Sequence, residues 1–150
     1  MSTSDVEATD RKILELLAGD GRMSFTDLGK ATGLSTSAVH QRVKRLETRG
    51  LIKGYGATID HDQLGLPLTA FISIRPIDPS QPDDSPERLQ CIQEIESCWS
   101  VAGEESYILK IRVPTPSHLE DLLARIRAAA NVSTRTTIVL STPYENRSVV

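Results

Sequence analysis

The chain has 150 residues, enough for one domain or for two small ones with their own hydrophobic cores. Its N-terminus is polar and acidic, and no run of 18 apolar residues occurs, which excludes a secretory signal and a membrane span and predicts a cytoplasmic protein. The formal net charge of −3 is uneven, because residues 1–60 carry nine Lys/Arg and eight Asp/Glu whereas residues 61–150 carry eight and twelve. A local basic surface can still attract DNA phosphates, since the Debye length in physiological salt is only about 8 Å.

Residues 9–22 predict an amphipathic helix. Its apolar side chains recur at helical spacing, at Ile13, Leu14, Leu16 and Leu17. Thr9 or Asp10 is expected to cap its start. We expect this helix to cover the back of the two helices that follow.

Residues 24–53 carry the most informative pattern, two short amphipathic segments that meet at a Gly-Leu turn. Ser24 and Ser35 are expected N-caps, since each hydroxyl can accept a hydrogen bond from an open amide of the following turn. Gly33 supplies the backbone freedom that a sharp turn needs, and Gly50 is expected to end the second helix in the left-handed conformation. This pattern predicts a helix-turn-helix, a motif that docks against double-stranded DNA.

The second helix of this pair separates into an inward and an outward stripe at about 100° per residue. Three apolar residues fall on the inward stripe, Val39, Val43 and Leu46. Polar side chains on the outward stripe have the size to reach base edges, and we predict base contacts from Ser37, His40, Gln41 and Lys44. Arginines on the flank are predicted to bind phosphates, namely Arg42, Arg45 and Arg49. Between Ser35 and Lys53 there are five Lys/Arg and one Asp/Glu, whereas a solvated helix of an unrelated domain usually mixes its charges.

After the second helix, residues 51–60 change to β character, and we expect a small wing or a connecting strand there. This makes the first unit winged-helix-like. Gly65 and Pro67 mark residues 61–67 as a linker. The predicted DNA-binding domain is therefore residues 1–60, and a second domain occupies residues 68–150.

The second domain begins with residues 68–77, whose alternation of apolar and polar side chains predicts a strand. Ser85 and Pro86 then open a helix, because proline is preorganised for the first helical position. The buried side of this helix is expected to be Leu89, Ile92 and Ile95. The sequences CWSVAG and YILKIRV predict two further strands, joined in a tight hairpin across residues 103–106.

A second helix, capped by Ser117, and a last strand over residues 134–141 complete the order β-α-β-β-α-β, which is the ferredoxin-like arrangement. The predicted fold class is therefore α+β. Both helices cover one face of an antiparallel sheet in this topology, and neither face of the predicted strands is consistently polar. We expect the open face to pack against a second copy of the chain.

Other residue types point away from metal sites and catalysis. Cys91 and Cys98 lie without Cys-x-x-Cys spacing, and we expect them to be buried, reduced thiols. The three histidines are scattered, so no metal site and no cofactor is predicted. The sequence contains no Ser-His-Asp or Cys-His arrangement and no phosphate-binding glycine loop. No enzymatic activity is therefore predicted.

The three-helix unit, linker and β-α-β-β-α-β domain together resemble the Lrp/AsnC family of feast/famine transcription regulators over nearly the whole chain. The most specific parts are TDRKILELLAGDGRMSFTDLGKATGLSTSAVHQRVKRLETRGLIKGYGATID and VAGEESYILKIRV. The resemblance implies a homodimer formed by the sheet domains and assembled into an octamer. It also implies amino-acid effectors bound between dimers, and target genes of amino-acid metabolism.

An effector site is expected around the hairpin of the second domain. Glu104 or Glu105 could pair with an α-ammonium group, and the open amides of the turn could hold the carboxylate. The full set of predicted effector contacts is Gly103, Glu104, Glu105, Ser106, Tyr107 and Ser141, the last because it corresponds to a polar contact position in family members. The family hairpin commonly reads Val-x-Gly-Asp where this chain has Val-Ala-Gly-Glu, so a turn that only closes the hairpin stays open as an alternative.

Two functions compete at this point. One is a sequence-specific, ligand-responsive transcription regulator. The other is an architectural, nucleoid-associated protein that wraps DNA without an effector, through phosphate contacts and bending alone. Binding of amino acids to the second domain discriminates between them.

Overall fold

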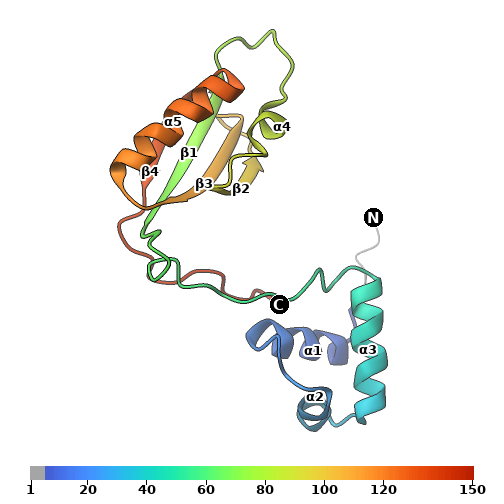
Figure 1. Cartoon of the computed structure of the whole chain (residues 1–150). Helices are drawn as coiled ribbons and strands as arrows, with labels where there is room; N and C mark the ends of the chain where they lie inside the picture. The colour runs from blue at the N-terminus through green and yellow to red at the C-terminus, as the bar shows by residue number, and fades with distance from the viewer. Residues whose placement is uncertain (1–5) are drawn as a thin grey trace. The chain divides into compact units, whose positions relative to one another are not determined.

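The computed structural model describes residues 6–150, and the chain divides into two compact units. One unit runs as far as Thr58 and also takes in Tyr144–Val150, and the other is Ile59–Pro143. Figure 1 shows the helices of the first unit in blue and cyan and the second unit from green to red.

Three helices make up the first unit: α1 (Ala8–Gly19), α2 (Phe25–Thr32) and α3 (Thr36–Thr48). Their core consists of five side chains that are at most 2 % exposed: Ile13, Leu28, Val39, Val43 and Leu46. Complete burial of one such side chain stabilises a fold by about 1.5–3 kcal/mol relative to its exposure. The inward stripe predicted for α3 is confirmed.

Side-chain and glycine caps fix the ends of the helix-turn-helix. The hydroxyls of Ser24 and Ser35 each accept a backbone N–H from three residues on, at 3.0 and 3.2 Å. Gly33 follows α2 with φ 77°, and Gly50 follows α3 with φ 80°, both in the left-handed region. The three predicted caps at Ser24, Ser35 and Gly50 and the predicted role of Gly33 in the turn are confirmed, since local hydrogen bonding and glycine backbone freedom determine them.

The start of α1 and the exit from α3 differ from expectation. Glu7 precedes α1 without making a side-chain capping bond, and Thr9 and Asp10 lie inside its first turn, so the predicted caps are wrong. Residues 53–60 adopt no strand in this chain, so the expected exit strand is wrong as well. A strand needs a partner to satisfy its backbone groups, and the first unit contains only helices for this segment to meet.

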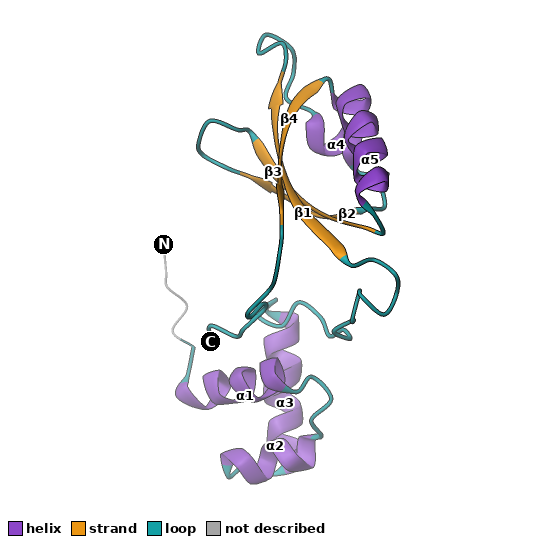
Figure 2. Cartoon of the chain, turned by 90° about the vertical axis from the view of Figure 1, so that its left-hand side faces the viewer, coloured by secondary structure: helices purple, strands orange, loops and turns teal. Residues whose placement is uncertain are grey.

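The second unit is a four-stranded antiparallel sheet in the order β2-β3-β1-β4 with two helices. Its elements are β1 (Leu68–Pro76), α4 (Ser85–Leu89), β2 (Ile95–Ser100), β3 (Tyr107–Val113), α5 (Pro116–Ala130) and β4 (Val132–Ile138). Figure 2 shows both helices on one side of the sheet, which leaves the other face open. The predicted ferredoxin-like topology and α+β class are confirmed.

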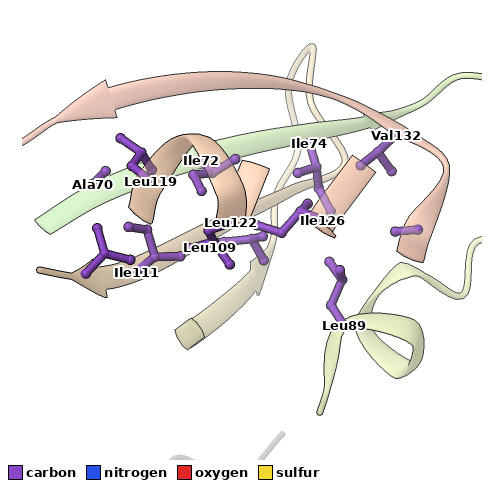
Figure 3. Packing of buried hydrophobic residues seen from close by; sticks show 12 residues of the cluster. Ala70, Ile72, Ile74, Leu89, Leu109, Ile111, Leu119, Leu122, Ile126 and Val132 are labelled. Carbon is purple, nitrogen blue, oxygen red and sulfur yellow. The ribbon is translucent and has the colours of Figure 1, made fainter. Parts of the chain in front are cut away.

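Alternate residues of the central strands fill the core between the sheet and α5 (Figure 3). The strands contribute Ala70, Ile72, Ile74, Leu109 and Ile111, all 0 % exposed. From α5 come Leu119, Leu122 and Ile126 at helical spacing. The switch from a period of two to a period near 3.6 is what the sequence predicted for these elements.

Several expected details of the second unit are wrong. α4 ends at Leu89, and Ile95 belongs to β2, because the chain must leave the helix early to reach the edge strand. Thr115 caps α5 by accepting the N–H of His118 at 3.3 Å, so Ser117 lies within the first turn. β4 ends at Ile138, three residues before the predicted end of the last strand.

Cys91 and Cys98 are both exposed and free, so their expected burial is wrong for the single chain. Cys91 follows the short helix α4 at the surface, and Cys98 lies on the edge strand β2. Both positions therefore lack an element that would cover them.

Candidate DNA-binding and effector surfaces

The outward stripe of α3 presents the polar side chains expected of a recognition helix. The four residues predicted to contact bases are all exposed, namely Ser37, His40, Gln41 and Lys44. The opposite side of the helix is buried against α1 and α2. Because side chains three and four positions apart share one side of a helix, these four form one continuous polar surface.

Phe25, at the start of α2, supports this surface from the side. Its ring meets the His40 imidazole edge to face, with 5.2 Å between the centroids and 79° between the planes. Edge-to-face packing of aromatic rings is favourable and restricts both side chains. The sequence analysis did not predict a role for Phe25. Its position directly after the N-cap serine, outside the apolar stripe that faces the core, could have indicated one.

Arg42 differs from the other arginines of α3, because carboxylates of α1 and its N-cap hold it. Its Nη1 lies 2.9 Å from Glu7 Oε2 and 2.9 Å from Asp10 Oδ1. The hydrogen bond to Glu7, and then the one to Asp10, raises the pKa of the Arg42 guanidinium. The Arg42 side chain is 26 % exposed and that of Asp10 only 3 %, so this contact is largely shielded from solvent.

The remaining cations of α3 are more accessible. Arg45 is 53 % exposed, and its Nη2 lies 3.7 Å from Asp10 Oδ2, within ion-pair range but beyond hydrogen-bond length. Lys44 and Arg49 are exposed. Two cations of α3 and the one at its C-cap are thus available to phosphates.

A hydrogen bond fastens the segment after α3 to the end of that helix. The Tyr55 hydroxyl donates to Glu47 Oε1 at 2.9 Å. The Tyr55 ring also lies beside the turn after α1, because a β-carbon on Gly21 would be 3.7 Å from its Cδ1. Burial raises the pKa of Tyr55, and the hydrogen bond to Glu47 raises it further.

In the second unit, two of the predicted effector residues line a cavity of about 160 Å³. Glu105 Oε1 lies 3.0 Å from Arg135 Nη2 across it. The lining comes from β1, β4 and the loop between β2 and β3, and comprises Ser73, Arg75, Glu104, Glu105, Ser133, Thr134 and Arg135. The cavity therefore offers both carboxylates and guanidinium groups, the pair of charges that a zwitterion needs.

The other predicted effector residues lie elsewhere in the single chain. Gly103 is exposed in the loop, and the Ser106 N–H donates to the Ile74 carbonyl at 3.0 Å, which ties the loop to β1. Tyr107 pairs in register with Ile74 and packs against the core, so it does not line this cavity. Ser141 lies beyond the end of β4 and is exposed.

The open face of the sheet is mixed rather than purely apolar. Phe71 and Trp99 stack with 6.5 Å between their ring centroids, and Ile108 is paired in register with Trp99. Beside them, Glu96 Oε2 lies 3.5 Å from Lys110 Nζ and 3.2 Å from Arg112 Nε. An apolar cluster thus adjoins a compact group of charges.

Comparison with known proteins identifies both units. Residues 7–47 match the AsnC-type helix-turn-helix domain, and residues 69–149 match the Lrp/AsnC ligand binding domain. The chain belongs to the Lrp/AsnC family. It is 55 % identical over 138 residues, 92 % of each chain, to the HTH-type transcriptional regulator LrpA of Mycobacterium tuberculosis. It is 34 % identical to the leucine-responsive regulatory protein of Escherichia coli, over 97 % of this chain and 92 % of that one.

Among solved structures, the feast or famine regulatory protein of M. tuberculosis complexed with L-methionine is 53 % identical, with a TM-score of 0.93. The alignment covers 95 % of this Lrp/AsnC chain and 97 % of that one. The chain is accordingly a transcription regulator with a helix-turn-helix and a ligand-binding domain, and its relatives are regulators and not enzymes. The architectural alternative is not favoured, because the second unit matches a ligand-binding model.

Within residues 6–150, no helix of this regulator is both long and apolar enough to cross a membrane. Over the same residues, His, Cys, Asp and Glu side chains form no group of three or more that could hold a metal ion.

Proposed function

We propose that this regulator reads DNA through α3, with Ser37, His40, Gln41 and Lys44 on base edges. Their common exposure on one side of a capped helix supports the proposal. Arg45 and Arg49 bind phosphates. Arg42, which sequence also predicted to bind phosphate, is left out of this proposal because two carboxylates already hold its guanidinium.

We further propose that an amino acid binds at the cavity beside Glu105 and Arg135. The ammonium group pairs with Glu105 or Glu104, and the carboxylate pairs with Arg135 or with open amides of residues 103–105. The ion pair between Glu105 and Arg135 supports this arrangement, since a zwitterion can insert between two such opposite charges. L-Methionine is the first candidate, because a relative at 53 % identity has been crystallised with it.

The assembly that we propose is a cytoplasmic homodimer, formed through the open sheet face, that associates further into an octamer. Phe71 and Trp99 on that face support the dimer, because an apolar cluster on a sheet is stabilised by cover. An effector bound near the loop between β2 and β3 would change how dimers pack and so the spacing of the DNA-binding units. Genes of amino-acid metabolism are the proposed targets.

A thermal-shift screen of the twenty amino acids on the full chain tests the effector proposal. Saturating L-methionine at about 100 times its Kd should stabilise the protein by about 2.7 kcal/mol. Gly103→Arg should abolish the shift and leave the dimer intact, since a β-carbon at Gly103 has no atom within 4 Å and the loop is exposed.

Gly19→Arg, in the first unit, is the matched control and should keep the shift. Calorimetry without heat for any of the twenty amino acids would contradict the effector proposal. A retained shift in Gly103→Arg would move the site elsewhere on the second unit.

A further inference from the structure

Asp10 is a buried carboxylate that contacts two arginines of α3 at once. Its Oδ1 accepts a hydrogen bond from Arg42 Nη1 at 2.9 Å, and its Oδ2 lies 3.7 Å from Arg45 Nη2. The contacts to Arg42 and Arg45 join positions 32 and 35 residues apart in the sequence. One side chain of α1 thus contacts two cations of α3.

Burial makes this arrangement sensitive to the charge of Asp10. A carboxylate that is 3 % exposed is tolerated only when its oxygens are paired. Arg42 satisfies that need, and Glu7 holds the same Arg42 nitrogen from a second side at 2.9 Å. The charge of Arg42 is therefore neutralised locally, and α3 presents fewer free cations than its sequence contains.

Arg45 is in a different position, because it remains 53 % exposed. A single ion pair at 3.7 Å is weak enough to leave the guanidinium accessible and still biases its direction. A phosphate can bind the exposed side of Arg45 while Asp10 stays on the other. Asp10 thus pairs with Arg42, which leaves Arg42 less available to phosphate, and it biases the direction of the exposed Arg45 side chain.

We propose that Asp10 is a positioning residue for DNA binding, which limits and orders the positive charges that α3 offers to phosphates. The inference rests on the proposed reading of DNA by α3. Binding to any DNA sequence grows with the number of phosphate contacts, whereas discrimination depends on the placement of α3 against base edges. Neutralising Asp10 should therefore strengthen binding to unrelated DNA while weakening discrimination, which loss of folding stability alone would not do.

The test measures the salt dependence of duplex binding by the full-length Asp10→Asn variant, on a selected site and on unrelated DNA. The slope of log K against log salt should steepen by about one unit per bound DNA-binding unit, because Arg45 loses its carboxylate partner and Arg42 keeps only Glu7, which is 66 % exposed. Affinity for unrelated DNA should rise about threefold at physiological salt, and the ratio of specific to non-specific affinity should fall. Glu15→Gln is the matched control, since it removes an acidic charge from α1 whose partner is Lys12 and not an arginine of α3.

Two further variants test the inference without leaving a buried charge unpaired. Arg42→Met combined with Asp10→Asn should return the salt slope to the wild-type value, whereas Arg45→Met alone should reduce it by about one unit. A slope below the wild-type value in the double variant would overturn the inference, because Arg42 would then bind phosphate in the wild type. A folded Asp10→Asn variant with the wild-type slope would overturn it as well, and would make Asp10 a purely structural residue. If the wild-type protein bound neither DNA duplex, the proposed function itself would be overturned.

Discussion

Gly29 of α2 lies directly against the carbonyl oxygen of Leu34, such that a β-carbon on Gly29 would be only 2.6 Å from that oxygen. The two residues are also joined by a hydrogen bond from the Leu34 N–H to the Gly29 carbonyl at 3.1 Å. Backbone atoms of Gly29 and Leu34 therefore pack directly against each other in the turn between α2 and α3. A side chain at position 29 would meet a backbone carbonyl, which cannot move aside as a flexible side chain could.

Gly29→Ala should destabilise the first unit by about 1–3 kcal/mol, because overpacking outweighs the gain in helix propensity. Gly19→Ala is the matched control: its β-carbon meets nothing within 4 Å, and the change should be neutral or stabilising. Denaturation followed by circular dichroism at 222 nm reports the helices, while Trp99 fluorescence reports the second unit. An unchanged helical transition in Gly29→Ala would contradict the tight turn.

Replacing Gln41 by Ala should relax sequence preference at one base position by about 1–3 kcal/mol, as expected for a lost base contact. Thr48→Ala, one turn beyond the predicted contacts on the same exposed stripe, is the control and should keep the preference. Binding selection from a randomised duplex library measures both. Wild-type preference in a Gln41→Ala, Lys44→Ala double variant would show that α3 does not read bases there.

Replacing Phe71 by Glu should shift the protein from dimer towards monomer, because the charge would be desolvated against a second copy. Sedimentation velocity at micromolar concentration measures the change. Ile77→Glu is the control, since Ile77 is 63 % exposed and follows β1 outside the open face. A Phe71→Glu variant that sediments as the wild type does would place the dimer interface on another surface.

Acid should weaken the second unit partly through Glu94. The hydrogen bond from Arg125 lowers the pKa of Glu94 below its ordinary value near 4.5. A carboxyl group with a lowered pKa stabilises the fold above its unfolded pKa, and this contribution is lost as the pH falls through the lowered value. The contribution should be under about 1 kcal/mol, because both side chains are partly exposed.

The Glu94 contribution is measured as the difference between wild type and Glu94→Gln in denaturant unfolding followed by Trp99 fluorescence. The difference should be present at pH 6 and absent well below pH 4. Glu120→Gln, on the exposed side of α5, is the control and should show little difference at either pH. Equal wild-type and Glu94→Gln stabilities at pH 6 would contradict a stabilising pair.

The features that sequence predicted well are those fixed within a few residues. The caps at Ser24 and Ser35 and the inward stripe of α3 depend on local hydrogen bonds and helical periodicity. The strand alternation that buries Ile72 and Leu109 is equally local. The cap of α5 was misassigned because Thr115 and Ser117 both carry suitable hydroxyls, and backbone direction decides between them.

The features that sequence missed depend on contacts between distant positions. The pairing of Asp10 with Arg42 spans 32 residues, so no local pattern indicates it. Periodicity assigned Arg42 to the flank of α3 without indicating what lies opposite. The predicted exit strand was wrong for a related reason. Residues 53–60 have the composition of a strand, but they can form one only beside another strand.

The hydrogen bond between Tyr55 and Glu47 determines how long the tether behind each DNA-binding unit is. With the bond closed, the irregular stretch that leaves the helices is residues 56–60, which spans at most about 18 Å when fully extended. With the bond open, residues 53–60 are released and the span grows to at most about 29 Å. In the proposed dimer, closing this bond would therefore shorten one of the two stretches of chain that join the units, the other being the one that leads to Tyr144, and would narrow the range of half-site spacings.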